Sequence, residues 1–301
     1  MTSGDAQPVE QIPDGSELVV HVDYGELSED PETERLLEAF AEEDPSVEDP
    51  AEIEEEFEDE LDIDPDDVDT VVAFVDDLEA SEQPGEDQFA LIAHGEFEGD
   101  SVIDAIEDEE GDLEETEHNG HTMFTFEDRS VRGDAAAIAS LGEGQVVVGD
   151  RQSVEDAIDT SAGDHDALSG DLRDAYDRST EDGLISVVVD FPGEEVPADD
   201  AAFGLDTSVL QSVETMSYEY YTTDGAAGSE LRLYTDRAAD AEDVNDVISG
   251  ALVAFGDTGM AELDAEIEKI SADQSSEDDT VVVVTYESDL DDIEALLETL
   301  P

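Results

Sequence analysis

The chain has 301 residues, of which 91 are Asp or Glu and 9 are Lys or Arg, so its formal net charge is −82. The absence of Cys excludes disulfides, thiolate metal sites and cysteine nucleophiles. The absence of any basic cluster excludes nucleic-acid binding through a cationic patch. No apolar run approaches the ~18 residues that a membrane-spanning helix needs.

The acidic excess indicates adaptation to molar salt. At low ionic strength this charge density would drive a compact chain apart, whereas in molar salt the Debye length falls to about 3 Å and screens the repulsion. Lys269 is the single lysine, and lysine depletion fits the same environment because salt drives its long apolar stem toward aggregation. We therefore predict a chain from an extreme halophile. K+, Na+ or divalent cations would associate non-specifically with its surface, and we expect no cofactor.

Apolar segments separated by acidic loops define the elements of the first half. Residues 1–13 form a polar leader that lacks the basic and apolar regions of a signal peptide. Strands are predicted at 17–24, 68–76, 88–97, 120–126, 135–141 and 145–149, with helices at 33–42, 51–61 and 101–107. The Gly142-Glu143-Gly144 run predicts a tight hairpin between the last two strands. Asp150 is predicted to cap the helix that follows.

The second half begins after an acidic, small-residue linker at 161–166. A helix containing Leu172 and Tyr176 comes first, and strands follow at 184–191, 214–222 and 229–234. The helix at 241–255 is the clearest in the chain, because its apolar residues recur at helical spacing. We predict further strands at 265–270 and 280–286, and a last helix capped by Ser288.

The two halves show the same order of elements, which predicts an internal duplication. Residues 17–24 (ELVVHVDY) correspond to 184–191 (LISVVVDF), and residues 68–77 correspond to the run that starts at Val213. The predicted fold is α+β, with two related units at 14–160 and 167–301. Each unit is expected to be a mainly antiparallel sheet with helices packed on one face.

Two segments resemble a family of bacterial and archaeal exported proteins of unknown function. In residues 142–159 (GEGQVVVGDRQSVEDAID), a turn leads to an apolar strand, a Gly and a capped helix that ends in Ile-Asp. In residues 12–24 (IPDGSELVVHVDY), a Pro-Asp turn leads into a strand. The resemblance implies a haloarchaeal member placed outside the membrane, with a lipid anchor upstream of residue 1, and it supplies no catalytic residue.

Two groups of residues are weak candidates for a metal site. His118 and His121 flank Asn119-Gly120 beside several Glu residues and could ligate a metal, although Asn-Gly before a strand is more typical of a solvated hairpin turn. Asp62, Asp64 and Asp66 form part of an Asp-rich run that suggests a calcium loop. An EF-hand needs Gly at the sixth position and Glu at the twelfth, where this run has Asp67 and Ala73.

The densest aromatic group is the candidate binding surface. Alternation along a strand places Met216, Tyr218 and Tyr220 on one face and Tyr221 on the other, and Tyr234 on a later strand joins one of these groups. The group is either a platform for a protein or surface-glycan partner or a packed sheet face whose hydroxyls reach water. His21, within a strand, is expected to point to solvent.

We predict no catalytic residues, because no Gly-x-Ser-x-Gly motif or Gly-rich phosphate loop is present. The favoured function is a non-catalytic binding or structural module displayed outside the membrane. The alternative is a cytoplasmic halophilic protein with a small-ligand or hydrolase site. A pocket with a buried polar cluster would favour this alternative, whereas an uncovered tyrosine-rich face would favour the module.

The charge predicts that the folded state needs roughly molar salt. Far-UV circular dichroism during dialysis from molar to millimolar NaCl should show cooperative loss of structure, because unscreened carboxylates repel one another. A folded spectrum at millimolar NaCl without divalent ions would contradict this prediction.

Overall fold

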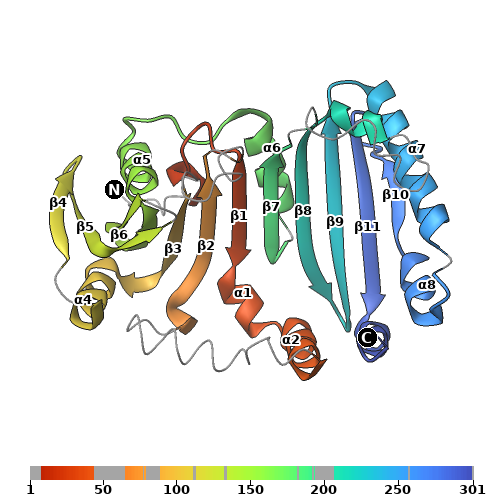
Figure 1. Ribbon diagram of the computed structural model, residues 1–301, viewed down its shortest axis with the longest axis horizontal. Coiled ribbons are helices and arrows are strands. Elements are labelled where there is room, and N and C mark those ends of the chain that lie inside the picture. The colour runs from red at the N-terminus through yellow and green to blue at the C-terminus, as the bar shows by residue number, and fades with distance from the viewer. Residues whose placement is uncertain are drawn as a thin grey trace. The chain divides into compact units, whose positions relative to one another are not determined.

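The computed structural model confirms the α+β class with antiparallel strands (Figure 1). It describes residues 8–299 except for 44–64, 77, 79–88, 111–112, 132–133, 182, 192, 194–206 and 257. The helix predicted at 51–61 therefore lies outside the described residues. The chain forms two compact units, residues 1–28 with 50–174 and residues 29–49 with 175–301. These ranges differ from the predicted ones at 29–49, which belongs to unit 2, and at 161–174, which belongs to unit 1.

Unit 1 contains six strands in the order β1-β2-β3-β6-β5-β4. Their bounds are β1 (Leu18–Asp23), β2 (Val68–Val75), β3 (Phe89–Glu98), β4 (Glu114–His118), β5 (His121–Val131) and β6 (Asp134–Asp150). The β4–β5 hairpin turns at Asn119 and Gly120, whose φ angles of 46° and 85° suit these two residue types. The predicted Asn-Gly turn is therefore confirmed.

The hairpin predicted at Gly142–Gly144 is wrong, because β6 is one continuous strand. Its first half pairs with β5 (Phe124 opposite Ile138) and its second half pairs with β3 (Ile92 opposite Val147). The strand bends where Gly142 and Gly144 adopt φ angles of 153° and 69°. Because pairing partners lie on both sides, the chain bends between them instead of reversing.

Helical elements pack against both faces of the unit 1 sheet. Helix α4 (Gly99–Glu110) packs against the face that carries Val146, through Val102 and Ile103. The opposite face is buried beneath α5 (Arg151–Ala162) and a 3-10 turn, η1 (Pro8–Gln11), which contact each other. As predicted, the Asp150 side chain caps α5 by accepting a hydrogen bond from the Ser153 amide, at 3.0 Å. The short helices α1 (Tyr24–Glu29) and η2 (Pro65–Asp67) border β1 and β2.

The predicted polar leader is partly interior. Val9, Gln11 and Ile12 are no more than 2% exposed. The Gln11 side chain donates a hydrogen bond to Gln145 Oε1 at 2.6 Å, which ties η1 to β6. The residues just before β1 are therefore a packed part of unit 1.

Unit 2 contains five strands in the order β7-β8-β9-β11-β10. Their bounds are β7 (Ile185–Asp190), β8 (Val213–Thr223), β9 (Ala226–Thr235), β10 (Ser271–Gln274) and β11 (Val281–Asp289). In each unit the first three strands form a meander. The last strand of the unit pairs with the third strand, and the strand before the last one in sequence pairs with the other edge of the last strand. This shared order agrees with the predicted duplication, which remains a prediction.

Helix α2 (Pro31–Glu43) packs within unit 2, although it precedes most of unit 1 in sequence. Arg35 contacts both carboxylate oxygens of Glu294 in α9 (Leu290–Leu297), at 2.5 and 2.8 Å. Leu36 packs with Ala227 and Leu290. The helix predicted at 33–42 is thus confirmed, and its Leu37 and Phe40 side chains remain 40% and 43% exposed.

The C-terminal part of unit 2 corrects two predictions. The strand predicted at 265–270 is instead helix α8 (Ala261–Ile267), followed by β10. The N-cap of α9 is Asp289, which makes no side-chain capping bond, whereas Ser288 lies within β11 and accepts a hydrogen bond from Lys269. The predicted long helix is confirmed as α7 (Ala238–Phe255), and η6 (Thr207–Ser212) packs against it. Helix α6 (Gly170–Ser179) buries Leu172 and Tyr176 as predicted.

Lys269, the single lysine, connects three elements near the C-terminal end of unit 2. Lys269 Nζ lies 2.8 Å from Glu266, 2.7 Å from Ser288 and 2.7 Å from Asp292. Burial alone would raise the pKa of Glu266, which is 6% exposed, but interactions with Lys269, Ser288 and Tyr286 lower that pKa below its ordinary value. One cation therefore holds α8, β11 and α9 around an ionised buried carboxylate.

Replacing Lys269 with Met should lower the free energy of unfolding by about 2–3 kcal/mol, because it leaves the buried Glu266 charge unpaired. Urea unfolding in molar NaCl measures this loss. The matched control is Arg151→Met, which removes an exposed pair with Glu155 and should cost less than about 0.5 kcal/mol. The double variant Lys269→Met, Glu266→Gln should recover part of the loss. Equal losses in the two single variants would contradict the prediction.

Candidate functional site

The central surface feature of unit 2 is an apolar row that crosses its sheet. Antiparallel pairing places Val187 of β7 opposite Tyr218 of β8, Tyr218 opposite Leu231 of β9, and Leu231 opposite Val284 of β11. Side chains opposite one another share a face. We call these four side chains the Tyr218 row. The neighbouring rows on this face are also largely apolar or aromatic, with Met216 on one side and Tyr220 on the other.

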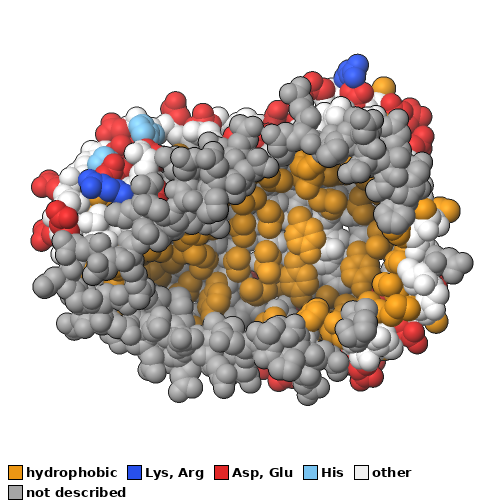
Figure 2. Space-filling view, in the orientation of Figure 1, with side chains coloured by type: hydrophobic (Ala, Val, Ile, Leu, Met, Phe, Trp, Pro, Cys, Tyr) orange, Lys and Arg blue, Asp and Glu red, His pale blue; other side chains and the backbone are white. Residues whose placement is uncertain are grey.

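The Tyr218 row remains open to solvent. Tyr218 is 39% exposed and the other three members are half-buried. Helix α7 covers the next row, where Leu233 and Val282 are at most 5% exposed. Figure 2 shows apolar side chains gathered over β8 and β9 in this view. Every large, exposed hydrophobic side chain among the described residues lies in unit 2, namely Leu37, Phe40, Tyr218, Val253 and Phe255.

The other predicted tyrosines divide between the two faces as the alternation indicated. Tyr220 shares the face of Tyr218, but its hydroxyl lies 3.1 Å from Thr33 Oγ1 of α2, and burial raises its pKa. Tyr221 lies on the opposite face, where burial and nearby carboxylates raise its pKa. Tyr234 shares that opposite face, with its hydroxyl 3.4 Å from Ser217. Of the four, Tyr218 is therefore the one positioned to meet a partner on the apolar face.

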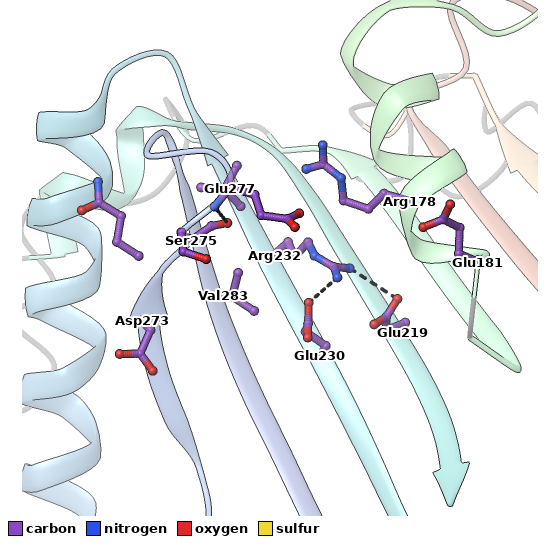
Figure 3. Close-up of a pocket in the computed structure, with 12 residues that line it drawn as sticks. Arg178, Glu181, Glu219, Glu230, Arg232, Asp273, Ser275, Glu277 and Val283 are labelled. Atoms are coloured by element: carbon purple, nitrogen blue, oxygen red, sulfur yellow. Dashed lines mark hydrogen bonds and ion pairs between the residues drawn. The ribbon is translucent and has the colours of Figure 1, made fainter.

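The opposite face of the same strands carries a polar pocket of about 540 Å³ (Figure 3). Arg232 of β9 lies on its floor, 3.3 Å from Glu219 and 2.5 Å from Glu230. Arg178 extends over it from α6, with its guanidinium carbon 6.0 Å from the centre of the Tyr234 ring. Neither arginine was predicted from the sequence as a site residue. Because the chain has so few basic residues, the position of each Arg in the sequence could have indicated this pocket.

The predicted histidine pair lies in the β4–β5 hairpin, where His118 and His121 are directly opposite each other. His118 Nε2 is 2.9 Å from Asp159 of α5, and His121 Nδ1 is 3.0 Å from the Ser140 carbonyl oxygen. Asp66 lies exposed in η2, and Asp62 and Asp64 lie outside the described residues. Within the described ranges, no group of three or more acidic or histidine side chains is arranged to hold a metal ion.

Unit 1 contains buried polar groups that the sequence did not indicate. His94 is 9% exposed, and its Nε2 atom lacks a hydrogen-bond partner in the described part of unit 1, as does Gln11 Oε1. Burial, with a smaller contribution from His21, lowers the pKa of His94 to about 4. His21 is half-buried and does not point freely to solvent as predicted, and this burial lowers its pKa. Burial therefore favours the neutral form of both histidines.

Asp76, at the end of β2, has the strongest perturbation among the described carboxylates. Burial raises its pKa to about 6, and the charges of Asp156, Asp150 and Glu17 add to this effect. A hydrogen bond from Ser16 Oγ at 2.8 Å opposes it. The folded state therefore favours the protonated form of Asp76.

Comparison with known proteins places the chain in a fold class and not in a family. It is an α+β protein with antiparallel sheets, and its fold is similar to that of TP0453. Crystal form III of TP0453 matches with a TM-score of 0.51 and 11% identity over 98% of each chain, and form IV with 0.51 and 9% over 97% of each. No protein-family model and no curated protein matches the chain. At this identity the likeness shows the fold alone.

The described helices contain none with both the length and the apolar character needed to span a bilayer.

Replacing Asp76 with Asn should stabilise unit 1 at neutral pH. The raised pKa means that Asp76 favours folding below its unfolded value of 3.8 and loses this contribution as the pH rises through about 6. Partial exposure reduces the expected gain to about 1 kcal/mol at pH 7. Thermal unfolding of both proteins from pH 4 to pH 8 measures it, with the exposed Asp224→Asn as control. A gain that is the same at every pH would contradict the assignment.

Proposed function

We propose that this chain is a non-catalytic binding module of an extreme halophile, and that the Tyr218 row is its binding surface. The observation that carries the proposal is the 39% exposure of Tyr218 at the centre of an apolar sheet face. Charged residues make up 33% of the chain, yet the four members of the row carry no charge. An apolar patch kept open on so acidic a chain is typical of an interaction site.

The geometry of unit 2 supports an apolar partner surface rather than a reaction centre. Tyrosine combines a large apolar ring with a hydroxyl that reaches water, which suits protein interfaces. The neighbouring Tyr220 is held by Thr33, so the surface beside the row is ordered before a partner arrives. A preorganised aromatic anchor lowers the entropy cost of binding. We therefore assign the row to a protein partner with an apolar face.

The proposed location is outside the membrane, in a haloarchaeon. Support comes from the residues that resemble the exported family, at 12–24 and 142–159, and from the acidic surface. Fractionation of native cells, with mass analysis of the N-terminus, should find a processed or lipid-modified form in the membrane or secreted fraction. An unprocessed N-terminus in the cytosol would contradict this part of the proposal and favour the cytoplasmic alternative.

Replacing Tyr218 with Asp should weaken apolar binding while leaving the fold intact, because the side chain is exposed and the change places a charge in the row. Nile red fluorescence in molar NaCl measures the affinity, which should fall at least about tenfold. The matched control is Thr223→Asp, which adds the same charge at an exposed position of the same strand. Equal Nile red binding by both variants would contradict the assignment of the row.

A further inference from the structure

The polar pocket of unit 2 contains a cation that forms no salt bridge with a described carboxylate. Arg232 is neutralised by Glu219 and Glu230, and the dashed lines in Figure 3 mark both contacts. Arg178 forms no salt bridge with any residue that the structure describes, and its contact is with the Tyr234 ring. In a chain with 91 acidic residues and 9 basic ones, pairing would be the default for any arginine. Five guanidinium N–H donors are therefore available at the edge of the pocket.

The pocket wall that faces Arg178 is the turn between β10 and β11, and hydrogen bonds within this turn hold it in place. In the turn between β10 and β11, Ser275 Oγ accepts from the Glu277 amide at 3.2 Å, and Asp278 accepts from Thr280 Oγ1 at 2.7 Å. Hydrogen bonds from Thr280 lower the pKa of Asp278, and the charge of Arg178 adds a smaller effect. Asp278 is thus engaged in the turn, while the Glu277 side chain extends over the pocket (Figure 3).

The charges that remain decide the ligand class. The pocket is lined by five carboxylates and two guanidinium groups, those of Glu181, Glu219, Glu230, Asp273, Glu277, Arg178 and Arg232. Arg232 is neutralised by Glu219 and Glu230. The lining then has one further cation, Arg178, and three further carboxylates. A simple anion would be repelled by these carboxylates, and a simple cation would leave the guanidinium unused. A ligand with one carboxylate and one ammonium group matches both signs.

We infer that this pocket binds a small zwitterion of the amino-acid or short-peptide class. Arg178 receives the carboxylate in a bidentate contact, and Glu277 and its neighbouring carboxylates receive the ammonium group. The Tyr234 ring holds the guanidinium in place between binding events. A volume of about 540 Å³ lies within the range of small-molecule sites. This site lies on the face of the sheet opposite the Tyr218 row, so it stands or falls independently of the proposed function.

The test compares three probes in molar KCl by calorimetric titration of the full chain. The probes are the dipeptide Ala-Ala, its N-acetyl form, which lacks the ammonium group, and its amide, which lacks the carboxylate. We expect Ala-Ala to bind, and each capped form to bind at least about tenfold more weakly. Replacing Arg178 with Gln should reduce Ala-Ala affinity to that of the amide. Arg151→Gln, in unit 1, is the matched control and should leave affinity unchanged.

Three results would overturn the inference. These are an amide that binds as tightly as Ala-Ala, an Arg178→Gln variant that binds Ala-Ala with unchanged affinity, and no detectable Ala-Ala binding by the native chain. Far-UV circular dichroism of the Arg178→Gln variant separates a lost site from a lost fold. If that variant is unfolded, Arg178→Lys keeps the charge without the planar fork and should still weaken Ala-Ala binding.

Discussion

The excess of carboxylates over cations is the constraint on which the rest of the structure depends. Nine basic residues cannot balance 91 acidic ones, so the fold uses individual cations where separate elements meet. Arg35 joins α2 to α9, and Lys269 joins α8 to β11 and α9. These contacts are multidentate or partly buried, and salt screens such contacts less than exposed single pairs. Most of the carboxylates therefore have no basic partner, which leaves apolar sheet faces as the main source of cohesion.

Because apolar sheet faces supply most of the cohesion, it is informative that the Tyr218 row stays open to solvent. Within unit 2, α7 buries one apolar row of the sheet and α2 contacts another through Tyr220. The row between them keeps Tyr218 exposed. On the opposite face, Arg232 pairs with Glu219, whereas Arg178 forms no salt bridge within the described part of the chain. Two faces of one sheet therefore offer two chemically distinct surfaces.

Local patterns predicted what depends on local geometry. The strand period of two placed Tyr218 and Tyr221 on opposite faces, and the Asp150 cap and the Asn119-Gly120 turn followed from backbone preferences of those residue types. The long helix α7 was equally clear from its apolar spacing. These features need no knowledge of what lies across the fold.

The failures involve residues whose structure is decided by distant partners. A Gly-x-Gly run reverses or bends according to whether strands lie on both sides, and β6 has β5 and β3 as neighbours. The 265–270 segment is short enough for either a strand or a helix, and the contacts of Lys269 with Ser288 and Asp292 accompany the helix. The pocket was not predicted because Arg178 and Tyr234 are far apart in sequence.

Oxidative footprinting of the native protein in molar salt is the most direct test that the Tyr218 row is open to solvent. We expect rapid modification of Tyr218 and protection of Tyr176, which is 4% exposed, whereas equal protection of both would contradict an open binding face.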